Sequence, residues 1–143
     1  MKKFAAVAVL AVALSVPAIA LASKVKVTGG VVGDKNSRIS ATVVKKHGNM
    51  KVKGFRAANT NIRCGNQKGD FPLIRVTGPG LSVNNKGSFK ARIPNSAKPK
   101  EKVRISGIVR NGGRSISGNI KTNKLTIQGI SCDIPKQHFE LSK

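Results

Sequence analysis

The sequence predicts an all-β protein, built as a single antiparallel β-sandwich or partly closed barrel of about nine short strands. Three observations lead to this fold class. Apolar and polar residues alternate with a period of two in many short segments, and turn-forming residues separate those segments. No long stretch beyond the N-terminal region carries the 3.6-residue apolar period of a helix, and glycine recurs too often for stable helices.

The first segment, residues 1–22, has the pattern of a secretory signal peptide. Lys2 and Lys3 provide a positively charged start, and residues 4–16 are uncharged and mostly apolar. A small-x-small cleavage pattern ends the segment at Ala22. We therefore expect an exported protein, extracellular or associated with the cell envelope.

A membrane anchor is the alternative interpretation of this segment. Its apolar core is shorter than the roughly 20 residues of a membrane span, and Pro17 interrupts it. No later segment is apolar enough to cross a bilayer. We expect cleavage before Ser23, so that residues 23–143 form one domain of 121 residues.

Period-two alternation defines the expected strands in order along this domain. Apolar and β-branched residues occupy one face of each segment and lysine or arginine the other, as is typical of half-buried antiparallel strands. The expected inward residues are Val25 and Val27; Ile39, Ala41 and Val43; Met50 and Val52; Phe89, Ala91 and Ile93; Val103, Ile105, Gly107 and Val109; Ile116, Gly118 and Ile120; and Leu125 and Ile127.

Turn chemistry separates the expected strands. Clusters of Gly, Asn, Asp and Pro occur at residues 33–36, 47–49, 66–69, 78–80, 84–87, 95–99 and 111–113. Residues 97–101 are expected to form a surface crossover between the two halves of the fold.

A glycine-rich loop at residues 111–114, Asn-Gly-Gly-Arg, has three possible interpretations: a phosphate-binding loop, an active-site loop or the tip of a hairpin. A phosphate-binding loop needs a strand on one side and a helix on the other, but strand patterns flank this loop on both sides. Asn111-Gly112 is instead a preferred pair for a type I′ hairpin turn. Gly107 and Gly118 fall at inward positions, where we expect a large side chain from the facing sheet to cover them.

The chain contains two cysteines, Cys64 and Cys132, so one intramolecular pairing is possible. An exported protein matures under oxidising conditions, which favours a Cys64–Cys132 disulfide. The alternative is a catalytic thiol at Cys64 with His47 or His138 as its base, which requires the thiol to stay free.

Four segments together resemble a group of small, secreted, functionally uncharacterised bacterial β-sandwich proteins with a single cysteine pair. They are TGGVVGDKNSRISATVV at 28–44, KVKGFRAANTNIRCGN at 51–66, GSFKARI at 87–93 followed by VRISGIVRNGGRSISGNI at 103–120, and LTIQGISCDIPKQHFEL at 125–141. Phe139 stands where the closing aromatic of the group is often tryptophan. The resemblance implies a disulfide-linked β-sandwich and implies no activity.

The ionisable residues that catalysis requires are few. They are Asp34, Asp70, Glu101, Asp133, Glu140, His47 and His138. No two acids are close in sequence, and the expected pairing of the cysteines leaves few ligands for a metal. We expect a non-enzymatic protein without a metal or cofactor, and a hydrolase is the less favoured alternative.

Basic residues greatly outnumber acidic ones. Lys and Arg total 27 against five Asp and Glu, a net charge of +22, and removal of the signal segment leaves 25 basic residues and a net charge of +20. A net charge of magnitude about 2–8 is sufficient to keep a small domain soluble. The excess predicts a polyanionic partner or a negatively charged surface nearby.

The basic residues of the expected strands fall at outward positions, with acids rarely between them. We predict a polyanion-binding surface formed by Lys51, Lys53, Lys90, Arg92, Lys102, Arg104, Arg110 and Arg114. Trp and Tyr are absent and only five Phe are present, so sequence-specific nucleic-acid recognition is not expected. Anionic cell-envelope or extracellular polymers are the expected partners of an exported protein.

Two further interpretations stay open. The basic residues are also consistent with a scaffold that has no polyanionic partner. Alternatively, the protein is a protein-binding accessory or inhibitor module that uses an exposed loop within residues 66–80, which contains Phe71-Pro72-Leu73-Ile74. The sequence leaves the oligomeric state open.

Overall fold

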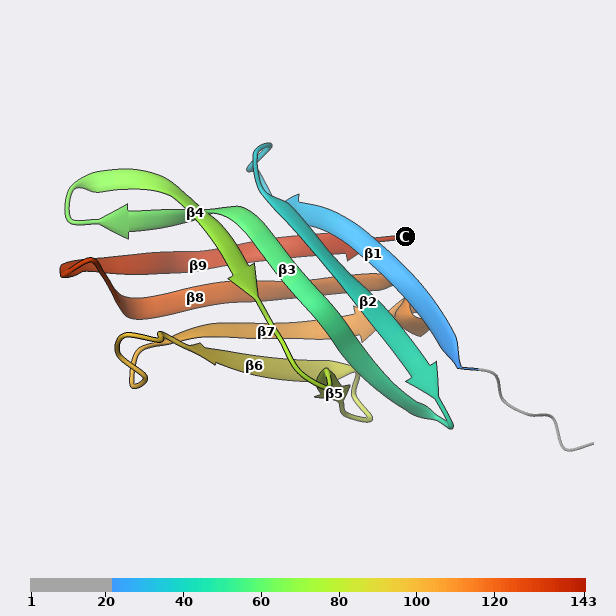
Figure 1. Ribbon diagram of the computed structural model, residues 1–143. Coiled ribbons are helices and arrows are strands. Elements are labelled where there is room, and N and C mark those ends of the chain that lie inside the picture. The colour runs from blue at the N-terminus through green and yellow to red at the C-terminus, as the bar shows by residue number, and fades with distance from the viewer. Residues whose placement is uncertain (1–21) are drawn as a thin grey trace, which may run out of the picture.

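The computed structural model describes residues 22–143, which form nine strands in one antiparallel sheet and confirm the all-β fold class. The strands are β1 (Ser23–Val31), β2 (Arg38–Lys46), β3 (Asn49–Cys64), β4 (Gln67–Arg75), β5 (Leu81–Val83), β6 (Ser88–Pro94), β7 (Lys102–Arg110), β8 (Ser115–Ile127) and β9 (Ile130–Ser142) (Figure 1). Apart from Ala22, the expected signal segment lies outside the described residues.

The sheet folds over on itself into two facing layers. Its hydrogen-bonded order is β4-β3-β2-β1-β9-β8-β7-β6, with β5 paired to β3 beyond the end of β4. Figure 1 shows β1 to β4 crossing in front of β6 to β9. The sheet bends from one layer into the other where β1 pairs with β9. The order begins at β4 and ends at β6, and these two strands are not paired with each other. The sheet therefore stays open along one side.

Strand β9 joins the layers along the other side, which we call the seam. Residues 28–31 of β1 pair with residues 139–142 of β9. Gly29 makes the close approach possible, because a Cβ there would collide with the carbonyl oxygen of Glu140. At its other end β9 pairs with β3, Cys64 opposite Cys132, and those two residues form a disulfide with an S–S distance of 2.09 Å. The predicted disulfide is confirmed.

Two side-chain interactions reinforce these pairings. The buried side chain of Gln137 accepts a hydrogen bond from Asn61 N at 3.1 Å and donates one to Asn61 O at 2.7 Å. Beside the disulfide, Arg63 Nη2 lies 2.8 Å from Asp133 Oδ2. Backbone pairs, an amide bridge, an ion pair and a disulfide thus hold β9 to the opposite layer.

The hydrophobic core lies between the layers and confirms the predicted inward pattern. Of the residues expected to face inward, Val25, Met50, Ile93 and Ile127 are half-buried and the other apolar ones are buried. Phe55 and Phe139, from opposite layers, fill the centre with ring centroids 5.5 Å apart.

Aromatic rings do cover Gly107 and Gly118, but they come from a different place than predicted. A Cβ on Gly107 would lie 2.5 Å from Cζ of Phe89, and one on Gly118 would lie 2.6 Å from Cζ of Phe139. Each ring belongs to the directly opposed residue on the adjacent strand of the same layer. The directly opposed residue on the adjacent strand is nearer, because cross-strand Cβ atoms lie about 5 Å apart whereas stacked layers lie about 10 Å apart.

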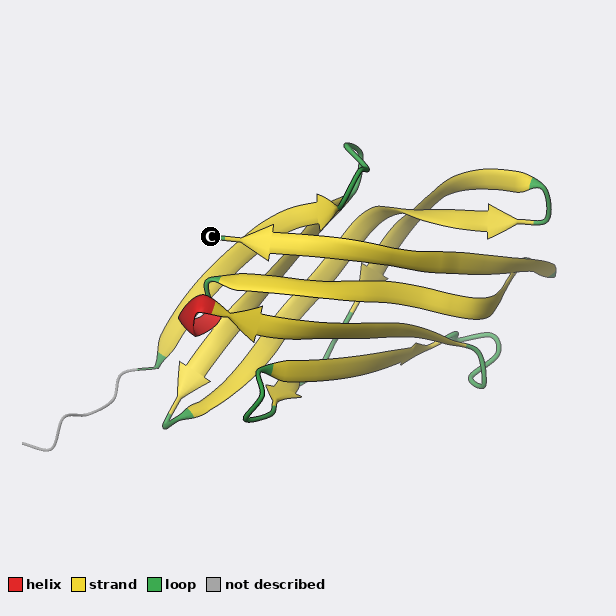
Figure 2. Cartoon of the chain, turned by 180° about the vertical axis from the view of Figure 1, so that it is seen from behind, coloured by secondary structure: helices red, strands yellow, loops and turns green. Residues whose placement is uncertain are grey.

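The glycine-rich loop is a hairpin tip, as predicted. Arg110 pairs with Ser115, and the intervening loop contains a single 3₁₀ turn at Asn111–Gly113 (Figure 2). Three successive residues have positive φ, from 53° at Asn111 to 97° at Gly113, which explains the glycines. The loop is longer than the two-residue type I′ turn expected, and its buried Gly113 packs against Val43 of the facing layer.

Two other expectations are corrected. Residues 97–101 do not cross between the halves of the fold, since they connect β6 to its neighbour β7 within one layer. Residues 66–80 are not chiefly a loop, since most of them form the edge strand β4. Pro72 does not interrupt β4, because β4 is an edge strand, where proline is tolerated.

Candidate functional site

The eight predicted polyanion-binding residues do not form one surface. Lys51 and Lys53 lie on β3, in the layer of β1 to β4. Arg110 and Arg114 lie beside the 3₁₀ turn, at one end of the β7–β8 hairpin. The other four residues, Lys90, Arg92, Lys102 and Arg104, lie exposed on the outer face of the opposite layer, on β6 and β7.

Strand register brings some of these cations directly opposite one another. Arg92 of β6 is paired with Arg104 of β7, and Arg104 is paired with Lys121 of β8. All three side chains are exposed, so they form a row of like charges across three strands. Side chains in such opposed positions have Cβ atoms about 5 Å apart, and like charges there destabilise the sheet.

The loop between β6 and β7 places two more cations close to Arg104 of this row. Lys98 and Lys100 are exposed and, with Lys102, Arg104 and Lys124, line a shallow pocket of about 670 Å³. We call the following residues together the basic face: Lys90, Arg92, Lys98, Lys100, Lys102, Arg104, Lys121 and Lys124. The loop lysines were missed as site residues at the sequence level, although the run Lys-Pro-Lys-Glu-Lys at residues 98–102 was the signal that could have identified them.

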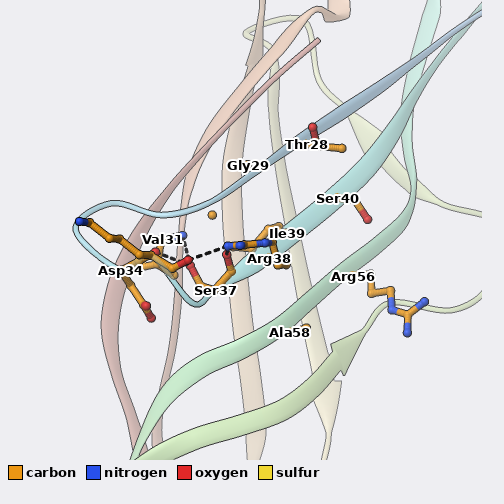
Figure 3. Close-up of a pocket in the computed structure, with 12 residues that line it drawn as sticks. Thr28, Gly29, Val31, Asp34, Ser37, Arg38, Ile39, Ser40, Arg56 and Ala58 are labelled. Carbon is orange, nitrogen blue, oxygen red and sulfur yellow. Dashed lines mark hydrogen bonds between the residues drawn. The ribbon is translucent and has the colours of Figure 1, made fainter.

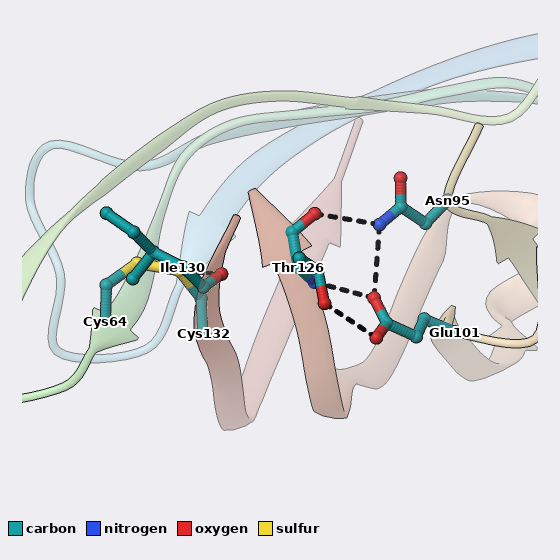
Figure 4. The surroundings of a disulfide bond; sticks show 6 residues. All are labelled: Cys64, Asn95, Glu101, Thr126, Ile130 and Cys132. Carbon is teal, nitrogen blue, oxygen red and sulfur yellow. Dashed lines mark hydrogen bonds between the residues drawn. A yellow bond between two sulfur atoms is a disulfide. The ribbon is translucent and has the colours of Figure 1, made fainter. Parts of the chain in front are cut away.

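The acid within this run, Glu101, also lines the pocket, and its carboxylate holds the loop in place (Figure 4). The carboxylate of Glu101 accepts hydrogen bonds from Thr126 N at 2.6 Å, Thr126 Oγ1 at 2.8 Å and Asn95 Nδ2 at 3.2 Å. The backbone hydrogen bond from Thr126 is the main cause that holds the pKa of Glu101 below its ordinary value, and the side chains of Thr126 and Asn95 and the charge of Lys98 act in the same direction. The carboxylate thus fixes residues 95–101 to β8.

An apolar cleft lies on the open side of the sheet, and we call it the open-side cleft. It has a volume of about 480 Å³. Side chains from β4 and β6, the two strands that are not paired with each other, line it. Ile74, Val103 and Leu125 form its buried base. Its half-buried apolar walls are Phe71, Leu73, Ile93 and Ile127.

A third hollow, of about 730 Å³, lies where the β1–β2 loop folds beside β3 (Figure 3). Its polar groups are largely used within the loop. Arg38 Nη1 donates to the carbonyl oxygens of Lys35 and Ser37, at 2.7 and 2.9 Å. The buried Ser37 Oγ accepts from Val31 N at 2.7 Å and donates to Asp34 O at 3.2 Å. We interpret this hollow as a hydrogen-bonded loop rather than a site.

The predicted alternative of a catalytic thiol is wrong, because Cys64 is in the disulfide. His47 is exposed in the β2–β3 turn, and His138 is exposed on β9 with Nε2 3.5 Å from Glu140 Oε1. Within residues 22–143 no three His, Cys, Asp or Glu side chains gather as a metal site would need.

In the same part of the chain no helix is long and apolar enough to cross a membrane. Comparison with known proteins adds no relative: no family model, no curated protein and no solved structure matches this chain.

Proposed function

We propose that this protein is an exported, non-enzymatic binding protein that associates with anionic cell-envelope or extracellular polymers through the basic face. The observation that carries the proposal is the row Arg92–Arg104–Lys121, in which three cations are directly opposed across neighbouring strands. The five acids of the chain are not among the paired residues of this row. A polyanion relieves the repulsion and gains affinity from the same field that the row creates.

The described aromatic residues argue against recognition of nucleic-acid bases. Phe55, Phe89 and Phe139 are buried in the core, and Phe71 is half-buried in the open-side cleft. Single-stranded nucleic acids are usually bound by stacking bases on exposed aromatic rings. The basic face offers charge without such rings, which favours a repeating anionic polymer read by its charge spacing.

Salt-dependent retention on a heparin-like resin and on isolated cell walls tests the proposal. We expect binding at low salt and release at higher salt, because association displaces counterions. Passage of the protein through both materials at low salt would refute the proposal.

A charge-matched pair of variants tests the face itself. The first variant carries Arg92→Gln, Arg104→Gln and Lys121→Gln, and the control carries Lys24→Gln, Lys26→Gln and Lys51→Gln on the other layer. Both lose three charges, so we expect only the first to elute at clearly lower salt than the unmodified protein. Equal elution of the two variants would mean that net charge alone decides binding.

A protein-binding accessory or inhibitor module is the second candidate function. The unpaired edge of β4 favours it, because a free strand edge can add a strand from a partner. A stoichiometric protein partner that stays bound at high salt would support this function over polyanion binding.

A further inference from the structure

The open-side cleft and the basic face share one wall, the loop at residues 95–101. Asn95 and Ala97 line the cleft, whereas Lys98 and Lys100 line the basic pocket. Strand β7 continues the division, because Val103 points into the cleft and its neighbours Lys102 and Arg104 point outward. An apolar cavity and a cluster of cations are therefore separated by a single segment of chain.

The cleft has the size and composition of a ligand site. Its volume of about 480 Å³ lies within the range of about 300–1,000 Å³ typical of small-molecule pockets, which are mostly apolar. β4 and β6 are not paired with each other, and side chains from both strands line the cleft.

The wall between the two regions is held in a fixed position. Glu101 binds Thr126 through both carboxylate oxygens, and Asn95 Nδ2 donates to Thr126 O at 3.0 Å. Lys98 N and Glu101 N also donate within the loop, to Asn95 O and Lys98 O. Little ordering of the loop is then required when a ligand binds, which favours affinity.

An exposed apolar residue lies next to the cleft. Ile130 is 57% exposed and is paired with Ile127, whose half-buried side chain lines the cleft. It flanks the tight β8–β9 turn at Gln128-Gly129, where both residues have positive φ. The tip of this hairpin thus carries apolar surface beside the cavity and close to the disulfide (Figure 4).

We propose that the open-side cleft binds one acyl chain of an anionic phospholipid, with the phosphate of its head group held by the cations of the basic pocket. The proposal rests on the proposed function, because the same basic face supplies the head-group contacts. An anionic polymer without an acyl chain would use the basic pocket and leave the cleft empty. A neutral lipid would use the cleft and gain nothing from the lysines.

Calorimetric titration tests the proposal with defined probes. The purified protein is titrated with lysophosphatidic acid below its critical micelle concentration and, separately, with glycerol 3-phosphate, which is the same molecule without the acyl chain. Each methylene group removed from water raises affinity by about fourfold, so we expect the lipid to bind at least about 100-fold more tightly. Methyl NMR signals of Leu73, Ile93 and Ile127 should shift with the lipid only.

A matched pair of variants locates the acyl chain. Leu73→Asn places an amide in the wall of the cleft, and Ile108→Asn places one at a partly exposed position on the outer face of β7. We expect the first variant to bind the lipid little more tightly than glycerol 3-phosphate. The second variant should keep the full difference in affinity between the two probes. Both should keep their heparin retention, since neither alters the basic face.

The outcomes separate this inference from the proposed function. Equal affinities for the two probes, with unmoved methyl signals in the unmodified protein, would overturn the lipid site while heparin retention upheld polyanion binding. Lipid binding without heparin retention would overturn polyanion binding. The NMR measurement needs no variant, so it decides the question even if Leu73→Asn fails to fold.

Discussion

The two long sides of the folded sheet are held in different ways. Along the seam, β9 is joined to the opposite layer by backbone hydrogen bonds, the Gln137–Asn61 bridge and the disulfide. Along the open side, β4 and β6 share no backbone pairing, and apolar side chains and the loop at residues 95–101 stand between them. The seam is built from backbone and covalent links, whereas the open side relies on side chains.

Because of this difference, the side that stabilises the fold is not the side through which a ligand reaches the core. A continuous set of links along one side lets the other side stay unpaired without loss of the fold. On the open side the core reaches the surface at the open-side cleft, where Ile74 of one layer and Val103 and Leu125 of the other form its base. We therefore expect changes at the seam to affect stability most, and changes on the open side to affect binding most.

The largest expected effect is loss of the disulfide. The double variant Cys64→Ala, Cys132→Ala removes a crosslink between residues 68 positions apart in the sequence. The unfolded chain then gains conformational entropy, which lowers the free energy of unfolding by about 4 kcal/mol. The open-side truncation Ile93→Val should lower it by only about 1 kcal/mol. Chemical unfolding followed by circular dichroism measures both, since the chain has no Trp or Tyr for fluorescence. Similar losses of unfolding free energy in the two variants would contradict the view that the seam contributes more to stability than the open side.

The second effect is at the amide bridge of the seam. Gln137→Ala removes both hydrogen bonds to the partly buried backbone of Asn61, and each such hydrogen bond contributes about 0.5–1.5 kcal/mol to stability. The same substitution at the exposed Gln67 should change the free energy of unfolding by less than about 0.5 kcal/mol. Hydrogen exchange at the Asn61 amide should quicken in the first variant only. An unchanged exchange rate would show that the bridge does not hold the seam.

Much of this fold could be predicted from the sequence because strand patterning is local. Alternation alone placed Val27, Ile105 and Ile120 in the core, and the expectation of export together with a single cysteine pair predicted the disulfide. The path of the chain between strands could not be predicted in the same way. Which strand follows which in the sheet depends on packing across the core, so residues 97–101 were assigned to the wrong kind of connection.

The candidate site was only partly predictable for the same reason. Alternation assigned Arg92 and Arg104 to an outward face, but only strand register shows that they are opposed to each other. Lys51 has the same local pattern and lies on the other layer. The open-side cleft could not be foreseen, because it arises from the absence of pairing between strands far apart in sequence.

A third and smaller effect distinguishes cations on the basic face from those at the seam. Arg104→Gln removes repulsion from Arg92 and Lys121, so the free energy of unfolding should rise by about 0.2–1 kcal/mol at low salt. Arg63→Gln breaks the partly exposed ion pair with Asp133 and should lower it by up to about 1 kcal/mol. Both changes should shrink at high salt, because salt screens exposed charges. A loss of stability in both variants would contradict the proposed repulsion.

The smallest effect concerns how the open side responds to pH, and it is tested at Glu101. Hydrogen bonds from Thr126 and Asn95 stabilise the ionised carboxylate, so its pKa in the folded protein lies below the ordinary value. A lowered pKa means that the contribution to stability is present above the ordinary glutamate pKa of about 4.3 and is lost as the pH falls through the lower folded pKa. The seam bridge at Gln137 is uncharged and has no such dependence.

The melting temperatures of the unmodified protein and of Glu101→Gln should therefore differ at neutral pH, and the difference should shrink as the pH falls below the ordinary glutamate pKa of about 4.3. The same comparison for Gln137→Ala should give a difference that stays constant through this range. Because both proteins in each pair carry the other four acids, their titration cancels in the difference. A difference for Glu101→Gln that persists unchanged at pH 3 would show that the carboxylate acts through its shape alone. The loop at residues 95–101 would then be fastened by hydrogen bonds that do not depend on the charge of Glu101.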